Sequence, residues 1–144
     1  MGHETLLLCG ANIIAESPEG KILLQKRRDT GLWDYCGGSM EPDERAEDAA
    51  RRELLEETGL SAGNLELIGV YSGPDFHIRY PNGDDVSYVE IVFRCTDYVG
   101  ELTPQEEEVT ELEYFPLTQL PSEMMPSSQL VLKDYMRKKK EGAF

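Results

Sequence analysis

The chain is poor in basic residues. It carries 14 Lys and Arg against 28 Asp and Glu over 144 residues, which gives a formal net charge of −14 with neutral histidines. Proteins that bind nucleic acid use Lys and Arg to neutralise phosphates, so this balance argues against a nucleic acid partner. A phosphorylated small molecule stays compatible with an acidic chain, because a bound cation reverses the local field.

Cysteine is scarce, and long apolar runs are absent. Cys9, Cys36 and Cys95 are odd in number and have no C-x-x-C pair or histidine cluster beside them, so reduced thiols and a cytoplasmic location are expected. Cys9 and Cys95 lie in apolar stretches and are predicted to pack in the core. No segment is apolar enough to span a bilayer and no basic-then-apolar leader opens the chain, which argues against a membrane partner.

The composition fits one globular domain. Hydrophobic residues make up 40% of the chain and charged residues 29%, both ordinary values for such a domain. A chain of this length can bury a single core, and no repeat, low-complexity block or linker interrupts it. The sequence therefore predicts one domain over residues 1–144.

Several segments have the composition of strands, namely residues 6–14, 21–25, 65–72, 86–95 and 111–115. The turn residues Ser17-Pro18-Glu19-Gly20 predict that the first two of these strands form a hairpin. Residues 73–85 are expected to form a long loop, of a length that is often functional.

Two segments are predicted helices. Residues 45–58 lack Gly and Pro and are rich in Ala, Leu, Glu and Arg, and Gly59 suits the left-handed position after the helix end. A last helix is expected near the end of the chain, capped by Ser127 or Ser128, and the basic run 137–140 is interpreted as a solvated tail. The strands and helices together indicate an α+β or mixed α/β fold.

Three carboxylates of the first predicted helix share one face. Glu53, Glu56 and Glu57 stand at positions i, i+3 and i+4. A helix with no use for three neighbouring negative charges would be expected to interleave Lys or Arg among them. Mg²⁺ prefers oxygen ligands, often one or two carboxylates together with substrate phosphates. The pattern therefore favours a metal site over the alternative, a solvated acidic helix face.

The spacing around these carboxylates resembles the Nudix box, G-x5-E-x7-R-E-U-x-E-E-x-G-U, in which U is apolar. Every specified position of the box is matched, by Gly38, Glu44, Arg52, Glu53, Leu54, Glu56, Glu57, Gly59 and Leu60. With this many fixed positions the resemblance is specific, in contrast to a lone glycine-rich loop.

Segments on either side of the box also resemble the family. Trp33 and Gly37-Gly38 are similar to its W-x-x-P-G-G element, with Cys36 where proline is common. The segment from Glu108 to Pro116 is similar to its E-x-x-E-L-x-W-F-P element, with Tyr114 in place of tryptophan. The resemblance therefore extends beyond the box itself.

The resemblance implies a fold, a reaction and a cofactor. The fold is a mixed β-sheet between helices, an α/β/α sandwich. The reaction is the metal-dependent hydrolysis of a phosphoanhydride bond in a nucleoside diphosphate linked to another group, with water as the nucleophile and Mg²⁺, or alternatively Mn²⁺, as the metal. A small nucleotide is the expected partner, and family analogy alone suggests a homodimer.

Three functions within this class stay open at the level of the sequence. ADP-ribose or a nucleotide sugar is the first candidate substrate, because Pro74 lies near the place where ADP-ribose hydrolases of the family carry a proline. The second function is a nucleoside triphosphatase that clears unwanted nucleotides. The third is a module that senses a nucleotide without cleaving it, which the intact box disfavours.

The resemblance also assigns roles to residues of the box. Glu56 and Glu57 are the leading metal ligands, and Glu53 is a third ligand or the general base. Gly38 is expected to offer its backbone carbonyl to the metal. Arg52 is expected to pair with a box glutamate, such as Glu56 one turn further on.

The general base has two candidate locations. Family members use either a box glutamate or a carboxylate on a later loop, and the run Gln105-Glu106-Glu107-Glu108 provides such a loop here. The resemblance places an extra metal ligand or base at Glu108, and a solvated acidic loop is the equal alternative. Glu44 is expected either to assist through water or to hold the loop before the helix.

Other side chains are candidates for contact with the substrate. The candidates for phosphate contact are Arg27, Arg28 and Arg79, and the candidates for stacking on a base are Trp33, Phe76, Tyr80 and Tyr88. A surface role is expected for at least two of the arginines, and core packing is the commoner role of an aromatic side chain.

Overall fold

The structure is a computed structural model that describes residues 4–105 and 107–144, so the part of the acidic-loop prediction that concerns Glu106 lies outside it. In chain order its elements are β1 (Thr5–Ala15), β2 (Lys21–Arg27), β3 (Trp33–Asp34), β4 (Cys36–Ser39), α1 (Ala46–Thr58), β5 (Glu66–Tyr71), the 3-10 helix η1 (Pro74–Phe76), β6 (His77–Arg79), β7 (Asp85–Cys95), β8 (Val109–Pro116) and α2 (Pro126–Lys140). Every strand and helix predicted from the sequence is present.

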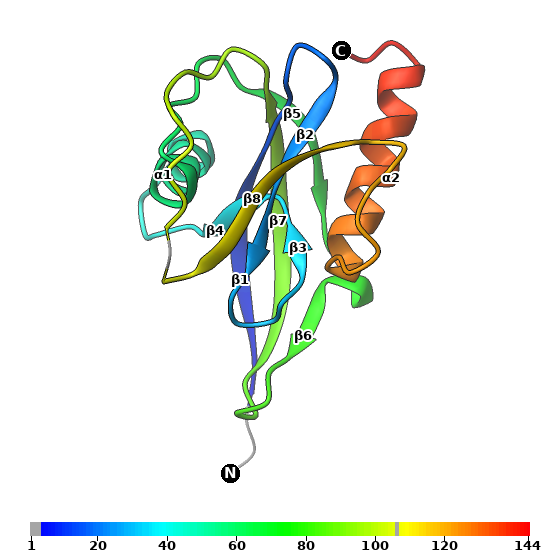
Figure 1. Cartoon of the computed structure of the whole chain (residues 1–144). Helices are drawn as coiled ribbons and strands as arrows, with labels where there is room; N and C mark the ends of the chain where they lie inside the picture. Colours follow the sequence, from blue (N-terminus) through cyan, green and yellow to red (C-terminus); the bar gives the residue numbers. More distant parts are fainter. Residues whose placement is uncertain (1–3, 106) are drawn as a thin grey trace.

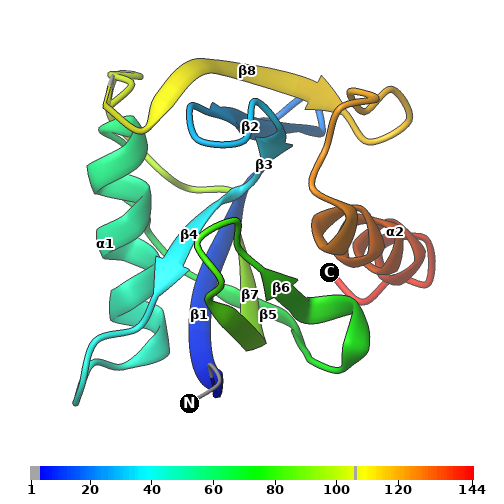
Figure 2. The ribbon, with the colours of Figure 1, turned by 90° about the horizontal axis from the view of Figure 1, so that it is seen from below.

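Two sheets lie between the two α-helices. The larger sheet has the strand order β4-β1-β7-β5 with β6 added on β7, and the smaller sheet has the order β3-β2-β8. β1 and β7 are parallel and the other pairs are antiparallel, so the larger sheet is mixed. Figure 1 shows α1 and α2 on opposite sides of the strands, and Figure 2 shows the smaller sheet running from α1 towards α2 along one side. The α/β/α sandwich is confirmed.

An apolar cluster lies on each face of the larger sheet. α1 packs on one face, where Ala49 and Ala50 are fully buried and let the helix approach the strands closely. α2 packs in the other cluster, to which Leu132 contributes. The side chains of β7 alternate between the two faces, since Phe93 belongs to the α1 cluster and Val92 to the α2 cluster.

The helix ends agree with the sequence at α1 and differ at α2. Gly59 follows α1 with a φ of 81° and donates its N–H to the carbonyl of Leu55, as the prediction of a left-handed end requires. The serine cap of α2 is wrong, because the helix begins at Pro126 after Met125, and the hydroxyl of Ser128 donates to Asp34 instead. Within residues 4–105 and 107–144, no helix is long and apolar enough to cross a membrane.

The predicted hairpin of the first two strands is wrong. The turn forms, since the N–H of Ser17 donates to the carbonyl of Lys21 at 2.8 Å. A single bridge, Glu16 to Ile22, then joins the two strands before they separate into different sheets. β1 is already occupied on both sides by β4 and β7, so β2 pairs with β3 and β8.

The long loop predicted over residues 73–85 is mostly ordered secondary structure. η1 and β6 occupy its first part, and β6 pairs antiparallel with the start of β7 through pairs such as Ile78 with Val86. The irregular part is the turn between the two strands, in which the N–H of Tyr80 donates to the carbonyl of Asp84. The sequence missed β6 because it spans only His77–Arg79.

The cysteine predictions hold at one of two positions. Cys95 is buried, as predicted, whereas Cys9 is exposed, so its assignment to the core is wrong. β4 pairs only with residues 10–13 of β1, and the half of β1 that precedes Gly10 extends beyond it along β7. Apolar composition alone could not show that this half of the strand lies outside the core.

The interpretation of residues 137–140 as a solvated tail is wrong for two of the four residues. Lys138 donates to the backbone carbonyl of Ile68 at 2.6 Å. Lys139 donates to the carboxylate of Glu16. These contacts attach the last turns of α2 to the sheet.

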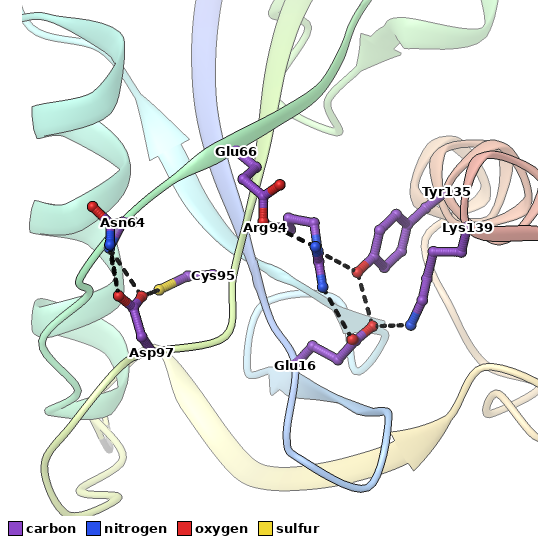
Figure 3. A network of polar contacts seen from close by, with 8 residues as sticks. All are labelled: Glu16, Asn64, Glu66, Arg94, Cys95, Asp97, Tyr135 and Lys139. Atoms are coloured by element: carbon purple, nitrogen blue, oxygen red, sulfur yellow. Dashed lines mark hydrogen bonds and ion pairs between the residues drawn. The ribbon is translucent and has the colours of Figure 1, made fainter. Parts of the chain in front are cut away.

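An ionic network ties α2 to one end of the larger sheet (Figure 3). The carboxylate of Glu16 accepts hydrogen bonds from Tyr135 at 2.8 Å and from Lys139, and it pairs with Arg94 at 3.3 Å. Arg94 also pairs with Glu66 at 2.9 Å. Burial acts to raise the pKa of Glu16, but the hydrogen bonds and positive charges around it outweigh burial, so the pKa is lowered.

Candidate active site

The box residues meet where β4 passes the second half of α1. The carboxylate of Glu53 lies so close to Gly38 that a Cβ there would approach its Oε1 to 2.6 Å. The backbone N–H of Gly37 donates to Oε1 of Glu57 at 3.0 Å. The lack of a side chain at Gly38 therefore lets the strand backbone approach the Glu53 carboxylate, and the neighbouring Gly37 contributes its backbone N–H to Glu57.

Glu57 is a buried carboxylate held by neutral donors. It is 3% exposed, and its other oxygen accepts a hydrogen bond from Nε2 of Gln25 at 2.9 Å. Burial raises the pKa of Glu57 to about 8, and the negative charge of Glu53 adds to the shift, while the bonds from Gln25 and Gly37 oppose it. Among the described residues, only these two neutral groups donate hydrogen bonds to Glu57.

Arg52 organises the rest of the box. Its guanidinium donates to Glu44 through Nε at 2.8 Å and Nη2 at 3.0 Å, and to Glu53 through Nη1 at 2.9 Å. The Glu56 carboxylate is more distant, at 3.5 Å. The prediction that Arg52 pairs with a box glutamate is confirmed. Two of its nitrogens donate to Glu44, and Glu53 is a closer partner than Glu56.

Glu44 holds the loop before α1, which was one of its two expected roles. Besides the fork from Arg52, it accepts the backbone N–H of Glu41 at 3.0 Å. These bonds, with that of Arg52 the strongest influence, lower the pKa of Glu44 to about 2. The carboxylate is therefore committed to the loop.

Glu53 is bonded to Arg52 and is also influenced by the charges of two further glutamates, Glu56 and Glu108. Burial raises its pKa, Arg52 opposes the shift, and the charges of Glu56 and Glu108 add to it. The side chain of Glu56 is 53% exposed, and Glu108 is exposed at the end of the loop that precedes β8. The structure thus brings Glu53 and Glu57 together in the interior and leaves the other two at the rim.

The donor set fits a hard divalent cation. Within the described ranges, no three His, Cys, Asp or Glu residues converge as a ready-made metal cluster. Glu53 and Glu57 nevertheless offer carboxylate oxygens, the ligands that such a cation prefers, and a bound cation would favour the ionised forms that burial and neighbouring charge disfavour. Glu56, Glu108 and the carbonyl of Gly38 stay available as further donors, so their expected roles remain predictions.

A cavity of about 490 Å³ opens beside the box. Glu53, Gly38, Glu108, Tyr80 and Tyr88 are among the residues that line it, whereas Glu56 and Glu57 do not. A second cavity of about 440 Å³ lies next to it and is lined by Gln25, Arg27, Arg28, Asp29, Gly37, Glu57, Glu107, Glu108 and Val109. Arg27, Asp29, Gly37 and Glu108 line both cavities, so the two adjoin each other beside the box.

The candidate substrate contacts divide between cavity and core. Arg27 lines both cavities, Arg28 the second and Arg79 the first. Trp33 is 8% exposed and packs edge-on against Phe115, and Phe76 is also buried, so neither lines a cavity. The available aromatic wall is the pair Tyr80 and Tyr88, whose hydroxyls lie 2.9 Å apart.

Several polar residues of the site were not found from the sequence. Gln25, Asn12 and Glu90 each interrupt an apolar strand segment, and Asp34 follows Trp33. A polar side chain within an otherwise buried strand needs a partner, so these interruptions were the available signal. The structure shows that all four line one of the two cavities.

The fold and the box together define a Nudix hydrolase. A family model described as the NUDIX domain matches residues 8–135, so the chain belongs to this family. Enzymes of the family act on small nucleotide substrates and generally use a divalent metal.

Relatives with different activities in their names resemble the chain. A Methanocaldococcus jannaschii protein named ADP-ribose pyrophosphatase is 38% identical over 122 residues, which cover 83% of this chain and 68% of that protein. A Bacillus subtilis protein provisionally named 8-oxo-dGTP diphosphatase is 51% identical over 67 residues, which cover 46% of this chain and less than half, 45%, of that protein. A solved structure of a MutT Nudix hydrolase from Burkholderia pseudomallei superposes with a TM-score of 0.77 at 26% identity, over 89% of this chain and 97% of that one.

Proposed function

We propose that the protein hydrolyses a phosphoanhydride bond in a nucleoside diphosphate linked to another group, with Mg²⁺ as its metal. The observation that carries the proposal is Glu57, a carboxylate 3% exposed that accepts hydrogen bonds from neutral groups beside the charge of Glu53. Burial of such a group is costly without a compensating charge. A hard divalent cation compensates it and also binds phosphates.

We assign different chemical roles to the box residues according to their positions. Glu57 and Glu56 would hold the cation, and the backbone carbonyl of Gly38 is the further ligand that the family resemblance implies. When bound, the cation neutralises the phosphates and activates water. Glu53 accepts the proton of the attacking water, because it is the box glutamate that lines the larger cavity. Glu108 lines both cavities and is the alternative base.

Arginine side chains bind the phosphates in this proposal. Arg27 lines both cavities, and its orientation is fixed by Asp29, which accepts from Nε at 3.0 Å and from Nη2 at 2.9 Å. Arg79 lies at the wall of the larger cavity. Arg52 acts indirectly, since it holds Glu53 in position through a bond of 2.9 Å.

Two leaving groups are candidates. ADP-ribose or a nucleotide sugar gives a nucleoside monophosphate and a sugar phosphate, and the Methanocaldococcus relative supports it. A nucleoside triphosphate gives a monophosphate and pyrophosphate, and the Bacillus relative supports that reading. Both substrates need the same carboxylates and differ in what lies beyond the phosphates.

The test is a turnover screen with Mg²⁺ and resolved products across ADP-ribose, nucleotide sugars, dinucleoside polyphosphates and nucleoside triphosphates. Cleavage to a monophosphate and a sugar phosphate supports the first leaving group, and release of pyrophosphate supports the second. Saturable binding without turnover of any of them would contradict the proposal and favour a sensing module.

A further inference from the structure

The carboxyl of Glu90 lines the larger cavity, and Gly10 and Gly37 lie close to it and to its partner Asn12. Nδ2 of Asn12 donates to Oε2 of Glu90, and the two side chains belong to the parallel neighbours β1 and β7. A Cβ on Gly10 would approach Oε2 of Glu90 to 2.2 Å, and a Cβ on Gly37 would approach Oδ1 of Asn12 to 2.1 Å. Both flanking positions therefore need glycine for this pair to fit.

A second carboxyl lines the same cavity from β3. Oδ1 of Asp34 accepts the backbone N–H of Tyr35 at 2.9 Å and the hydroxyl of Ser128. Burial raises the pKa of Asp34 to about 6, Ser128 and the charge of Arg27 oppose the shift, and the charge of Glu90 adds to it. The two carboxyls are therefore close enough to influence each other.

Glu90 and Asp34 each have one carboxyl oxygen that accepts no hydrogen bond from the described residues. The bonds from Asn12 and Ser128 use Oε2 of Glu90 and Oδ1 of Asp34. In the described part of the chain, no side chain or backbone N–H donates to the remaining oxygens, Oε1 of Glu90 and Oδ2 of Asp34. Both residues line the cavity, so a ligand that donates hydrogen bonds can satisfy these oxygens.

Two tyrosines of the cavity wall lie near Glu90 and offer a surface for a flat ring. Tyr80 and Tyr88 both line the cavity, and Tyr88 is two residues before Glu90 and hence on the same face of β7. Bases stack on aromatic side chains irrespective of their identity, so stacking alone gives no discrimination. Discrimination between bases therefore requires polar groups in the cavity wall.

We propose that Asp34 and Glu90 make the base end of the cavity selective for a purine edge that presents hydrogen-bond donors, which is the N1–H and N2–H₂ edge of guanine. The inference rests on the proposed function, since it concerns the nucleoside whose diphosphate is cleaved. Guanine offers two adjacent donors to a carboxylate. Adenine offers one amino group flanked by ring nitrogens that are acceptors, and acceptors facing carboxylate oxygens repel them. A site built on hydrogen bonds rejects a ligand that leaves them unpaired.

The test measures base preference without turnover. Calorimetric titration with the α,β-methylene analogues of GDP and ADP compares two ligands that differ only in the base and cannot be cleaved at that linkage. The GDP analogue is expected to bind at least about tenfold more tightly. Equal binding, or tighter binding of the ADP analogue, would overturn the inference.

Variants of the two carboxyls provide the second readout. Asp34→Asn and Glu90→Gln each present an amide N–H₂ to the donor edge, so each is expected to reduce the guanine preference about tenfold, whereas Asp75→Asn, on the exposed surface of η1, is the matched control. Thermal melting checks the fold of each variant. A preference unchanged in both folded variants would also overturn the inference.

Turnover separates this inference from the proposed function. For the pairs GTP and ATP, and GDP-glucose and ADP-glucose, the guanine member is expected to have the higher kcat/KM, with the difference in KM. Hydrolysis of both members at equal kcat/KM would count against the base preference and leave the proposed reaction standing. Tight binding of the GDP analogue without hydrolysis of any substrate would count against the reaction and leave the base preference standing.

Discussion

Two buried carboxylates of this protein have opposite surroundings. Glu16 is 6% exposed and Glu57 is 3% exposed. Glu16 is bonded to Lys139 and Tyr135 and paired with Arg94, and its pKa is lowered (Figure 3). Glu57 is bonded to Gln25 and a backbone N–H, and its pKa is raised to about 8.

The difference distinguishes a carboxylate that joins elements of the fold from one that we propose binds a metal. A buried charge with charged partners holds elements together, as Glu16 holds α2 to the sheet. A buried charge given only neutral donors leaves room for a further cation, which is what a metal site needs. The surroundings of each group therefore indicate its role more clearly than its burial does.

The largest expected effect is on stability, from Glu16→Gln. The variant leaves Arg94 and Lys139 without their buried counter-charge, so the free energy of unfolding should fall by about 3 kcal/mol or more. Urea unfolding measures it. The matched control is Glu66→Gln, because Glu66 pairs with the same Arg94 but is 52% exposed, and its loss should be below about 1 kcal/mol. An equal loss of unfolding free energy in the two variants would show that Glu16 has no special structural role.

The next effect is on activity, from Glu57→Gln. Turnover should fall by on the order of a hundredfold or more, equivalent to about 2.7 kcal/mol, because the amide cannot replace the carboxylate as a metal ligand. The unfolding temperature of metal-free protein should not fall, since a neutral amide of similar size replaces a buried carboxyl whose pKa is raised to about 8. Glu47→Gln, an exposed acid on the same helix, is the control for turnover. Near-wild-type turnover of the Glu57 variant would exclude the box from the mechanism.

A smaller effect is expected from Gln25→Leu, which removes one of the two neutral donors. Gln25 positions Glu57 through one bond, and its Oε1 is the sole buried side-chain polar atom without a partner in the described ranges, so few other contacts are lost. Affinity for Mn²⁺, measured by calorimetry, should weaken roughly tenfold. The control is Gln119→Leu at an exposed position. Unchanged affinity would show that the Gly37 backbone alone orients the carboxylate.

The last prediction is a difference in the slope of stability against pH, which for one titrating group is on the order of 1 kcal/mol per pH unit. The pKa of Glu57 is raised from 4.5 to about 8, so in metal-free protein its contribution lowers stability as pH rises through that range. The pKa of Glu16 is lowered from 4.5, so its contribution is present above 4.5 and is lost as pH falls through the lower folded value. Urea unfolding of wild type and each Gln variant across pH 3–9 checks the two signs. Slopes of the same sign would refute the comparison.

Much of the acidic site could be predicted because it is local in sequence. Glu53, Glu56 and Glu57 lie on one helix, so their spacing determines that they share a face. The end of the helix was also predictable from the sequence, because the left-handed conformation that follows a helix favours glycine, here Gly59. The structure adds that Glu56 is largely exposed while Glu57 is buried, a distinction that depends on what packs against the helix.

The partners that distinguish the two carboxylates are distant in sequence and were not predicted. Gln25 and Glu57 are 32 residues apart, and Lys139 and Glu16 are 123 apart. The failed hairpin has the same cause, because strand neighbours were inferred from proximity in the chain while β1 pairs with β4 and β7. Tertiary pairing overrides local signals in each case.

The three cysteines have a practical consequence for labelling. Burial raises the pKa of the Cys36 and Cys95 thiols, which makes both poor nucleophiles at neutral pH. Cys9 is exposed and lies immediately before Gly10, a residue of the cavity wall. A maleimide fluorophore should therefore attach at one position of the native chain without any engineered cysteine, on the face of β1 opposite to the Gly10 side of the cavity wall.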